Sequence, residues 1–272
     1  MTYDEKINGA TKFLLSNIGK NYAKTAIIFG SGLGGHIANF VSAFECSFNK
    51  IPHFPTSKLT TQTNTFKCGF WNGKQVIMLH GRVHWYEGFS AEEVVFGIRL
   101  LKELGVKNII LTGIIGYIGR AKLGSLFLIK DHINLIPDNP LRGQNSLRWG
   151  DRYPDMFETY DRNLMTIAKA YMKDLDIPFK TGVLAAVAGP NLETKAEYKA
   201  LKRLGAKGVS MSTVPEAIAA VQQGSKVLGL SIISDLCDPR NLKPANIDEL
   251  IRNSKIGREY LLTALELIVQ GA

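Results

Sequence analysis

The chain has 272 residues, of which 45% are hydrophobic and 21% charged, a composition typical of a soluble globular protein with a sizeable core. No apolar run reaches the roughly 18 residues that a membrane span needs, and the polar N-terminus lacks the apolar core of a signal peptide. The formal net charge is +9, but the basic residues are dispersed rather than gathered in one arm, which argues against a nucleic-acid partner. The three cysteines lack metal or redox spacing, so we expect a cytoplasmic protein.

The first part of the chain predicts alternating helices and strands. Asn72-Gly73 indicates a tight hairpin turn, and Ser90 with Glu93 is typical of a helix start. The stretch from residue 51 to 65 lacks periodicity and is expected to be a long loop, a kind of segment that often carries function. The expected helices are 3–18, 36–41 and 90–104, and the expected strands are 25–29, 44–48, 66–71 and 75–79.

The second part continues the same alternation. Its expected strands are 108–112, 125–129, 180–187, 207–211 and 226–234, and its expected helices are 160–175, 194–204, 212–223 and 247–269. No repeat, low-complexity linker or change in composition divides the chain. We therefore expect a single α/β domain over residues 1–272, with a mixed central sheet flanked by helices on both faces.

A glycine-rich turn, Gly30-Ser-Gly-Leu-Gly-Gly35, follows the first predicted strand. Such a turn can point several backbone N–H groups and the Ser31 hydroxyl at an anion, and we expect it to hold a phosphate. The turn also matches G-x-G-x-x-G, but the helix after it is short and Glu45 comes too early for a dinucleotide fold. A packing turn without a ligand is the other alternative.

Further polar, glycine-bearing segments also follow predicted strands. Ligands of open α/β sheets bind beyond the carboxyl ends of the strands, so these segments are expected to converge on one site, as in an enzyme. Arg82 and His84 are two residues apart, so both side chains are expected to point the same way, toward the anion. Glu193 and Asp235 follow strands and are candidates either for ligand binding or for solvated or capping roles, whereas Glu216 is expected to cap its helix.

The remaining histidines have no comparable partners and are interpreted as structural. No cluster of His, Cys, Asp or Glu has the spacing of metal ligands.

Several ordered motifs together resemble the trimeric purine nucleoside phosphorylases, from about Tyr3 to the C-terminal helix. The motifs are Gly30-Ser-Gly-Leu-Gly-Gly35, Ile51-Pro-His-Phe-Pro55, Gly81-Arg-Val-His-Trp-Tyr-Glu-Gly88, Asp131-His-Ile-Asn-Leu135, Asn139-Pro-Leu-Arg-Gly143, Gly150-Asp-Arg-Tyr-Pro154, Ala188-Gly-Pro190 with Glu193-Thr194, and Met211-Ser-Thr-Val-Pro-Glu216. The resemblance implies a phosphorylase/hydrolase-like fold, a homotrimer, and reversible cleavage of purine nucleosides by inorganic phosphate. It implies no metal or organic cofactor.

The resemblance also implies roles by position. Catalysis would depend on Asp235, His84 and Glu193. Phosphate would meet Ser31, Arg82, His84, Ser212 and the altered positions Ile114 and Gln62. The nucleoside would contact Tyr86, Gly116, Leu192, Glu193, Val209, Met211, Asp235 and Ile247, with Tyr153 reaching into a neighbouring subunit's site.

Four positions depart from the pattern of this family. The family's phosphate-facing His is here Gln62, and its Asn-Ala-Ala-Gly-Gly is Gly113-Ile-Ile-Gly-Tyr117. Its purine-binding Asn is Asp235, and the His that meets the 5′-hydroxyl is Ile247. A protonated Asp235 could donate to the purine N7, and an ionised one could accept from a 6-amino group. Ile247 would favour an apolar 5′ substituent, as in methylthioadenosine phosphorylases. A weakly active or inactive nucleoside-binding homologue is the further alternative.

Overall fold

The computed structural model describes residues 1–271, apart from the side chain of Ile247. Its helices are α1 (Tyr3–Ile18), α2 (Ala91–Val94), α3 (Phe96–Glu103), α4 (Arg162–Asp174), α5 (Lys195–Arg203), α6 (Val214–Gln222) and α7 (Ile247–Gly271). Its strands are β1 (Thr25–Phe29), β2 (Phe40–Ser47), β3 (Thr65–Trp71), β4 (Lys74–His80), β5 (Asn108–Tyr117), β6 (Leu126–Asn134), β7 (Phe179–Ala186), β8 (Ala206–Ser210) and β9 (Lys226–Leu236). Short 3₁₀ turns cover Phe48–Lys50 and Trp85–Glu87.

The strands form one mixed sheet in the order β2-β3-β4-β1-β5-β8-β7-β6-β9. The pairs β1–β4, β1–β5, β5–β9, β6–β7 and β7–β8 are parallel, whereas β2–β3, β3–β4, β5–β8 and β6–β9 are antiparallel. Because β5 pairs with both β8 and β9, the strands β5 to β9 close on one another at one end of the sheet. The mixed sheet expected from the sequence is confirmed.

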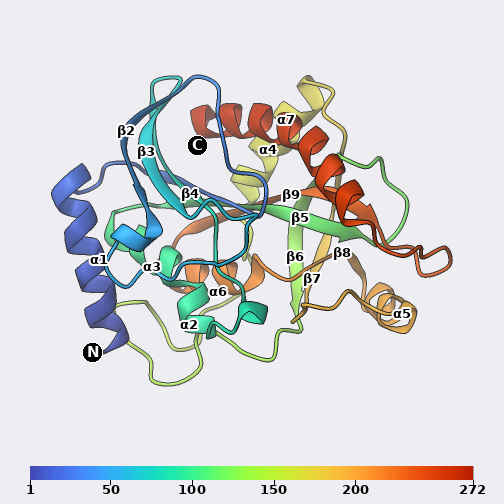
Figure 1. Ribbon diagram of the computed structural model, residues 1–272, viewed down its shortest axis with the longest axis horizontal. Helices are drawn as coiled ribbons and strands as arrows, with labels where there is room; N and C mark the ends of the chain where they lie inside the picture. Colours follow the sequence, from blue (N-terminus) through green and yellow to red (C-terminus); the bar gives the residue numbers. More distant parts are fainter. Residues whose placement is uncertain (272) are drawn as a thin grey trace.

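Two helical layers cover the sheet (Figure 1). One hydrophobic core joins α1, α3 and α6 to one face, around side chains such as Leu14, Leu101 and Ala217. A second core joins α4 and α7 to the other face, around side chains such as Met172 and Leu265. Burial of this apolar surface stabilises both layers. Because the helices cover the two faces of the sheet, the ends of the strands are the part of the sheet that can contact ligands.

The structure corrects three expectations about local structure. Residues 36–37 are irregular, residues 38–39 form a turn and β2 already begins at Phe40, so the short helix expected at 36–41 is absent from this described segment. The segment expected to open at Gly113 continues as strand to Tyr117, because its extended backbone pairs along β9. The single helix expected over 90–104 is interrupted at Val95, which separates α2 from α3. The hairpin turned by Asn72-Gly73 and the helix over 3–18 are confirmed.

Within the described residues, no helix is both long and apolar enough to cross a membrane.

Candidate active site

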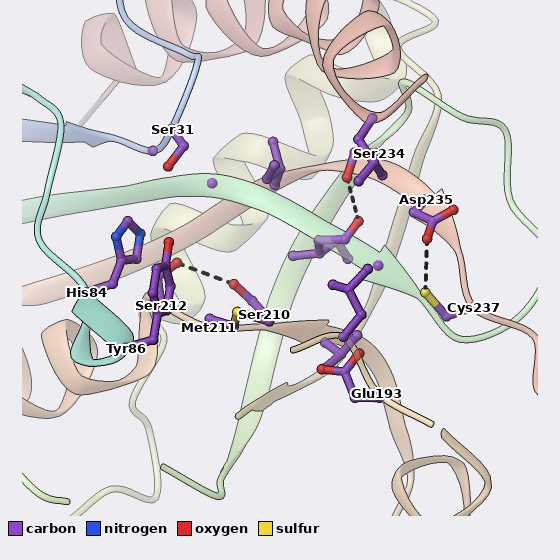
Figure 2. A pocket seen from close by; sticks show the side chains of 18 of the residues that line it. Ser31, His84, Tyr86, Glu193, Ser210, Met211, Ser212, Ser234, Asp235 and Cys237 are labelled. Carbon is purple, nitrogen blue, oxygen red and sulfur yellow. Dashed lines mark hydrogen bonds between the residues drawn. The ribbon is translucent and has the colours of Figure 1, made fainter. Parts of the chain in front are cut away.

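A cavity of about 190 Å³ lies where the Gly30 turn, β5, β8 and β9 meet (Figure 2). One end is lined by Ser31, His84 and Ser212, and the other by Glu193, Asp235 and Cys237. The segments expected to converge therefore do so. They meet through different strand ends, as is common for ligand sites of α/β folds.

The glycine turn depends on a close approach of two backbones. A side chain at Gly30 would place its Cβ 2.8 Å from the Cα of Gly113 on β5, closer than real Cβ contacts come. The loop opposite is tied to the turn, since Gly32 N donates to Thr61 O at 3.0 Å. Two adjacent glycine-bearing segments thus bring β1 and β5 together at the floor of the cavity.

Gln62 is hydrogen-bonded to Ser31 and does not itself line the cavity. Its Nε2 donates to Ser31 Oγ at 2.7 Å, and its Oε1 accepts from the Arg82 backbone N–H at 3.2 Å. Because Ser31 Oγ accepts this hydrogen bond, its own hydroxyl hydrogen is left for a ligand. Gln62 is buried and does not line the cavity.

His84 enters the cavity with its orientation fixed from behind. Its Nδ1 lies 2.8 Å from Glu87 Oε1, and Ser57 Oγ donates to Glu87 Oε2 at 2.6 Å. Burial alone raises the pKa of Glu87, but hydrogen bonds from His84 and Ser57 outweigh it and leave the pKa below its usual value. An ionised Glu87 can only accept, so His84 carries its proton on Nδ1 and leaves Nε2 to face a ligand. The ring of Tyr86 stacks on His84 with centroids 4.8 Å apart.

Arg82 does not point the same way as His84, contrary to the expectation from their spacing. Its guanidinium is buried and donates from Nη1 to Glu216 Oε2 at 2.7 Å and from Nη2 to Ile28 O at 3.2 Å. The two side chains diverge because the chain after β4 is irregular rather than a continued strand, so the alternation of side chains is lost.

The Arg82–Glu216 pair supports the backbone beside Ser212. Glu216 Oε2 also accepts from Thr213 N at 3.0 Å, which confirms Glu216 as the capping residue of α6. Thr213 has φ of 76°, a conformation that a β-branched residue adopts only where its surroundings enforce it. The buried ion pair therefore fixes the turn that presents Ser212 and the start of α6 to the cavity.

A β-bulge directs Asp235 into the cavity. The register between β5 and β9 shifts after Ile115, so that Ile115 pairs with Ile233 but Gly116 pairs with Asp235. The extra residue, Ser234, donates to Ile115 O at 3.3 Å. As a result both Ser234 and Asp235 line the cavity, although they are consecutive.

Glu193 enters from the turn after β7, and Met211 from the end of β8. Met211 fits over Gly189, where a Cβ would lie only 2.3 Å from its sulfur. Glu193 also lies close to the buried Tyr198 of α5 and raises the pKa of its hydroxyl, beyond the larger effect of burial. The capping box of Thr194 and Glu197 starts α5 at this point and so places Tyr198 one turn beyond the N-cap Thr194, on the helix that follows Glu193.

Most residues expected at the site lie on the cavity wall. They are Ser31, His84, Tyr86, Ile114, Gly116, Leu192, Glu193, Val209, Met211, Ser212 and Asp235. Arg82 and Gln62 lie behind it, Tyr153 is 88% exposed elsewhere on the surface, and the prediction for Ile247 falls on a side chain outside the described residues.

Sequence reasoning missed Ser210, Tyr198, Ser234 and Cys237, which also line the cavity. Ser210 could have been found because it alternates with Ser212, and Cys237 because it alternates with Asp235. Ser234 was hidden by the bulge, and Tyr198 by its place on the inner side of α5.

Among the residues that the structure describes, no group of three or more His, Cys, Asp or Glu is placed to hold a metal ion. The site instead has one end with the hydroxyls of Ser31 and Ser212 and the imidazole of His84, joined to a second end with two carboxylates. Such an arrangement can bind an anion and, beside it, a molecule with hydrogen-bond donors.

Comparison with known proteins agrees with this geometry. Residues 24–270 match the family model described as phosphorylase superfamily. The chain is 37% identical to purine nucleoside phosphorylase 1 of Bacillus subtilis over 266 residues, covering 97% of this chain and 98% of the relative. It is 38% identical to the purine nucleoside phosphorylase of Mus musculus over 255 residues, covering 91% and 88% of the two chains.

Solved structures match over nearly the whole chain. A schistosoma purine nucleoside phosphorylase in complex with hypoxanthine superposes with a TM-score of 0.89 at 28% identity, covering 99% of this chain and 98% of that one. The Schistosoma mansoni purine nucleoside phosphorylase in complex with adenosine superposes with a TM-score of 0.87 at 28% identity and the same coverage.

Proposed function

Because this chain belongs to the phosphorylase superfamily and is closely similar to purine nucleoside phosphorylases, we propose that it is a pentosyltransferase that cleaves purine nucleosides with inorganic phosphate. The reaction is the reversible phosphorolysis of purine ribo- or 2′-deoxyribonucleosides to the free base and the sugar 1-phosphate. The observation that carries this proposal is one cavity that gathers Ser31, His84 and Ser212 at one end and Glu193 and Asp235 at the other.

The phosphate occupies the end formed by the glycine turn, Ser31, His84 and Ser212. Ser31 has a free hydroxyl hydrogen, and the N-terminus of α6 adds its positive dipole end beside Ser212. Arg82 acts on this end from behind, because its pairing with Glu216 holds the Ser212 turn. Gln62 and Ile114 complete the surroundings of the phosphate.

The nucleoside lies with its sugar between the two ends. As the glycosidic bond breaks, the sugar becomes cation-like, and the bound phosphate serves as nucleophile and counter-charge. Tyr86 and Met211 line the ribose, with Gly116 leaving room beside it, and Leu192 and Val209 pack against the base. Glu193 and Asp235 meet hydrogen-bond donors of the purine and favour departure of the base.

The assembly completes the site. Tyr153 is 88% exposed and Phe157 is 80% exposed, an unusual degree for aromatic side chains of one loop. In a homotrimer, Tyr153 would cover the nucleoside in a neighbouring subunit. The enzyme works in the cytoplasm, with phosphate as co-substrate and no cofactor.

The test is to incubate the protein with phosphate and, separately, inosine, guanosine, adenosine and 5′-methylthioadenosine, and to measure the free base by chromatography. Base release that requires phosphate is expected. Release from methylthioadenosine would assign an apolar 5′ preference, as Ile247 suggests. No base from any of the four nucleosides would overturn the proposal and leave a nucleoside-binding homologue.

A further inference from the structure

Two uncharged side chains, Cys237 and Tyr198, lie beside the two carboxylates at one end of the cavity. Cys237 Sγ lies 3.6 Å from Asp235 Oδ2, and the dashed line in Figure 2 marks this contact. On the other side, Tyr198 packs in one small core with Cys237, and its hydroxyl lies near enough to the Cys237 thiol and the Glu193 carboxylate that both raise the pKa of Tyr198. Asp235 at the end of β9, Cys237 just after it, Tyr198 on α5 and Glu193 in the turn after β7 thus lie together in one wall of the cavity.

The direction of these hydrogen bonds follows from the chemistry of the groups. Burial raises the pKa of the Cys237 thiol to about 12, so the thiol keeps its hydrogen and donates it to Asp235. The Tyr198 hydroxyl is likewise protonated, because burial and its two partners raise its pKa. Leu236 N donates to the second oxygen, Asp235 Oδ1, at 2.8 Å. Both Asp235 oxygens are therefore held as acceptors.

The fold makes room for the sulfur of Cys237 at this place. A side chain at Gly116 on β5 would put its Cβ 2.6 Å from Cys237 Sγ. Cys237 is 1% exposed and Tyr198 is 3% exposed, and both pack in a small core with Val209. Cys237→Ala and Tyr198→Phe would keep most of this packing. These substitutions therefore test the polar contacts of the thiol and the hydroxyl with the groups that line the cavity.

We infer that Cys237 and Tyr198 are positioning residues that set the purine specificity of the site, an inference that rests on the proposed function. By holding Asp235 as an acceptor, Cys237 favours purines that present an amino group at position 6 over those with a 6-oxo group. Tyr198 lies beside both Glu193 and Cys237, so it supports binding of either kind of base. Neither residue contacts the phosphate end.

The experiment compares kcat/KM for adenosine and inosine in the wild type, Cys237→Ala, Cys237→Ser and Tyr198→Phe. Loss of one hydrogen bond to a charged group corresponds to roughly a fivefold or larger change. We expect Cys237→Ala to lower the adenosine-to-inosine ratio about fivefold, and Cys237→Ser, which keeps a donor, to restore it. Tyr198→Phe should raise KM for both nucleosides about fivefold and leave KM for phosphate unchanged.

The matched control is Cys46→Ala, which removes another buried thiol, on β2 and outside the cavity wall, and should leave the ratio unchanged. The inference would be overturned if the adenosine-to-inosine ratio and the nucleoside KM values of all three site variants stayed within about twofold of the wild type. If the wild type released no base, the proposed function would fail instead. Calorimetric binding of adenine and hypoxanthine to wild type and Cys237→Ala would then decide the inference, and equal affinities of the two proteins would refute it.

Discussion

The buried imidazole of His80 predicts a specific loss of stability in acid. His80 ends β4 directly behind the glycine turn, is 1% exposed, and has neither ring nitrogen hydrogen-bonded. Burial, with a smaller contribution from the nearby charges of Lys67 and Arg258, lowers its pKa from 6.5 to about 4. The native state therefore binds this proton less readily than the unfolded chain does.

The sign and size of the effect follow from linkage. Well above pH 6.5 His80 is neutral in both states and contributes no pH dependence. Between pH 6.5 and about 4 the unfolded chain takes up the proton first, so the native state loses stability as the pH falls. The loss amounts to ~2 kcal/mol between pH 7 and pH 5 and to ~3 kcal/mol once both states are protonated.

The assay is guanidinium unfolding at pH 7 and pH 5, at one protein concentration, for the wild type and His80→Gln. Glutamine cannot be protonated, so the fall in the free energy of unfolding should be about 2 kcal/mol smaller in the variant. His36→Gln changes an exposed histidine and is the matched control. An equal fall in wild type and His80→Gln would refute the reasoning, because it would mean that His80 finds a partner for its charge.

Three further predictions test the surroundings of the cavity. Glu216→Gln leaves the buried Arg82 charge without its partner and should lower the free energy of unfolding, measured in urea, by about 3 kcal/mol. A loss below about 1 kcal/mol would contradict the structural role of the pair. Gln62→Ala frees the Ser31 hydroxyl and should raise KM for phosphate about fivefold at unchanged nucleoside KM; an unchanged phosphate KM would remove Gln62 from this role. Tyr153→Ala should raise nucleoside KM in steady-state assays. Because the side chain is 88% exposed, the free energy of unfolding should change by less than about 0.5 kcal/mol. An unchanged nucleoside KM would place Tyr153 outside a neighbour's site.

Much of the secondary structure could be predicted because its signals are local. The helix at 3–18 and the hairpin at Asn72-Gly73 follow from apolar spacing, capping residues and turn chemistry within a few positions. Where the prediction was wrong, tertiary pairing overrode these signals. The glycines from 113 to 116 read as a loop, but they lie in β5 because β9 supplies hydrogen bonds to the whole stretch.

The site residues show the same difference between what local sequence signals predict and what tertiary contacts decide. The order of motifs in the chain identified the family and most of the residues on the cavity wall, since residue type and spacing carry that information. Residue spacing could not tell that Arg82 turns away from His84, or that a bulge brings Ser234 and Asp235 to the same wall. Those directions depend on which partner lies within reach. A guanidinium buried beside Glu216 binds it whatever the sequence spacing suggests, and only the packed structure brings that carboxylate there.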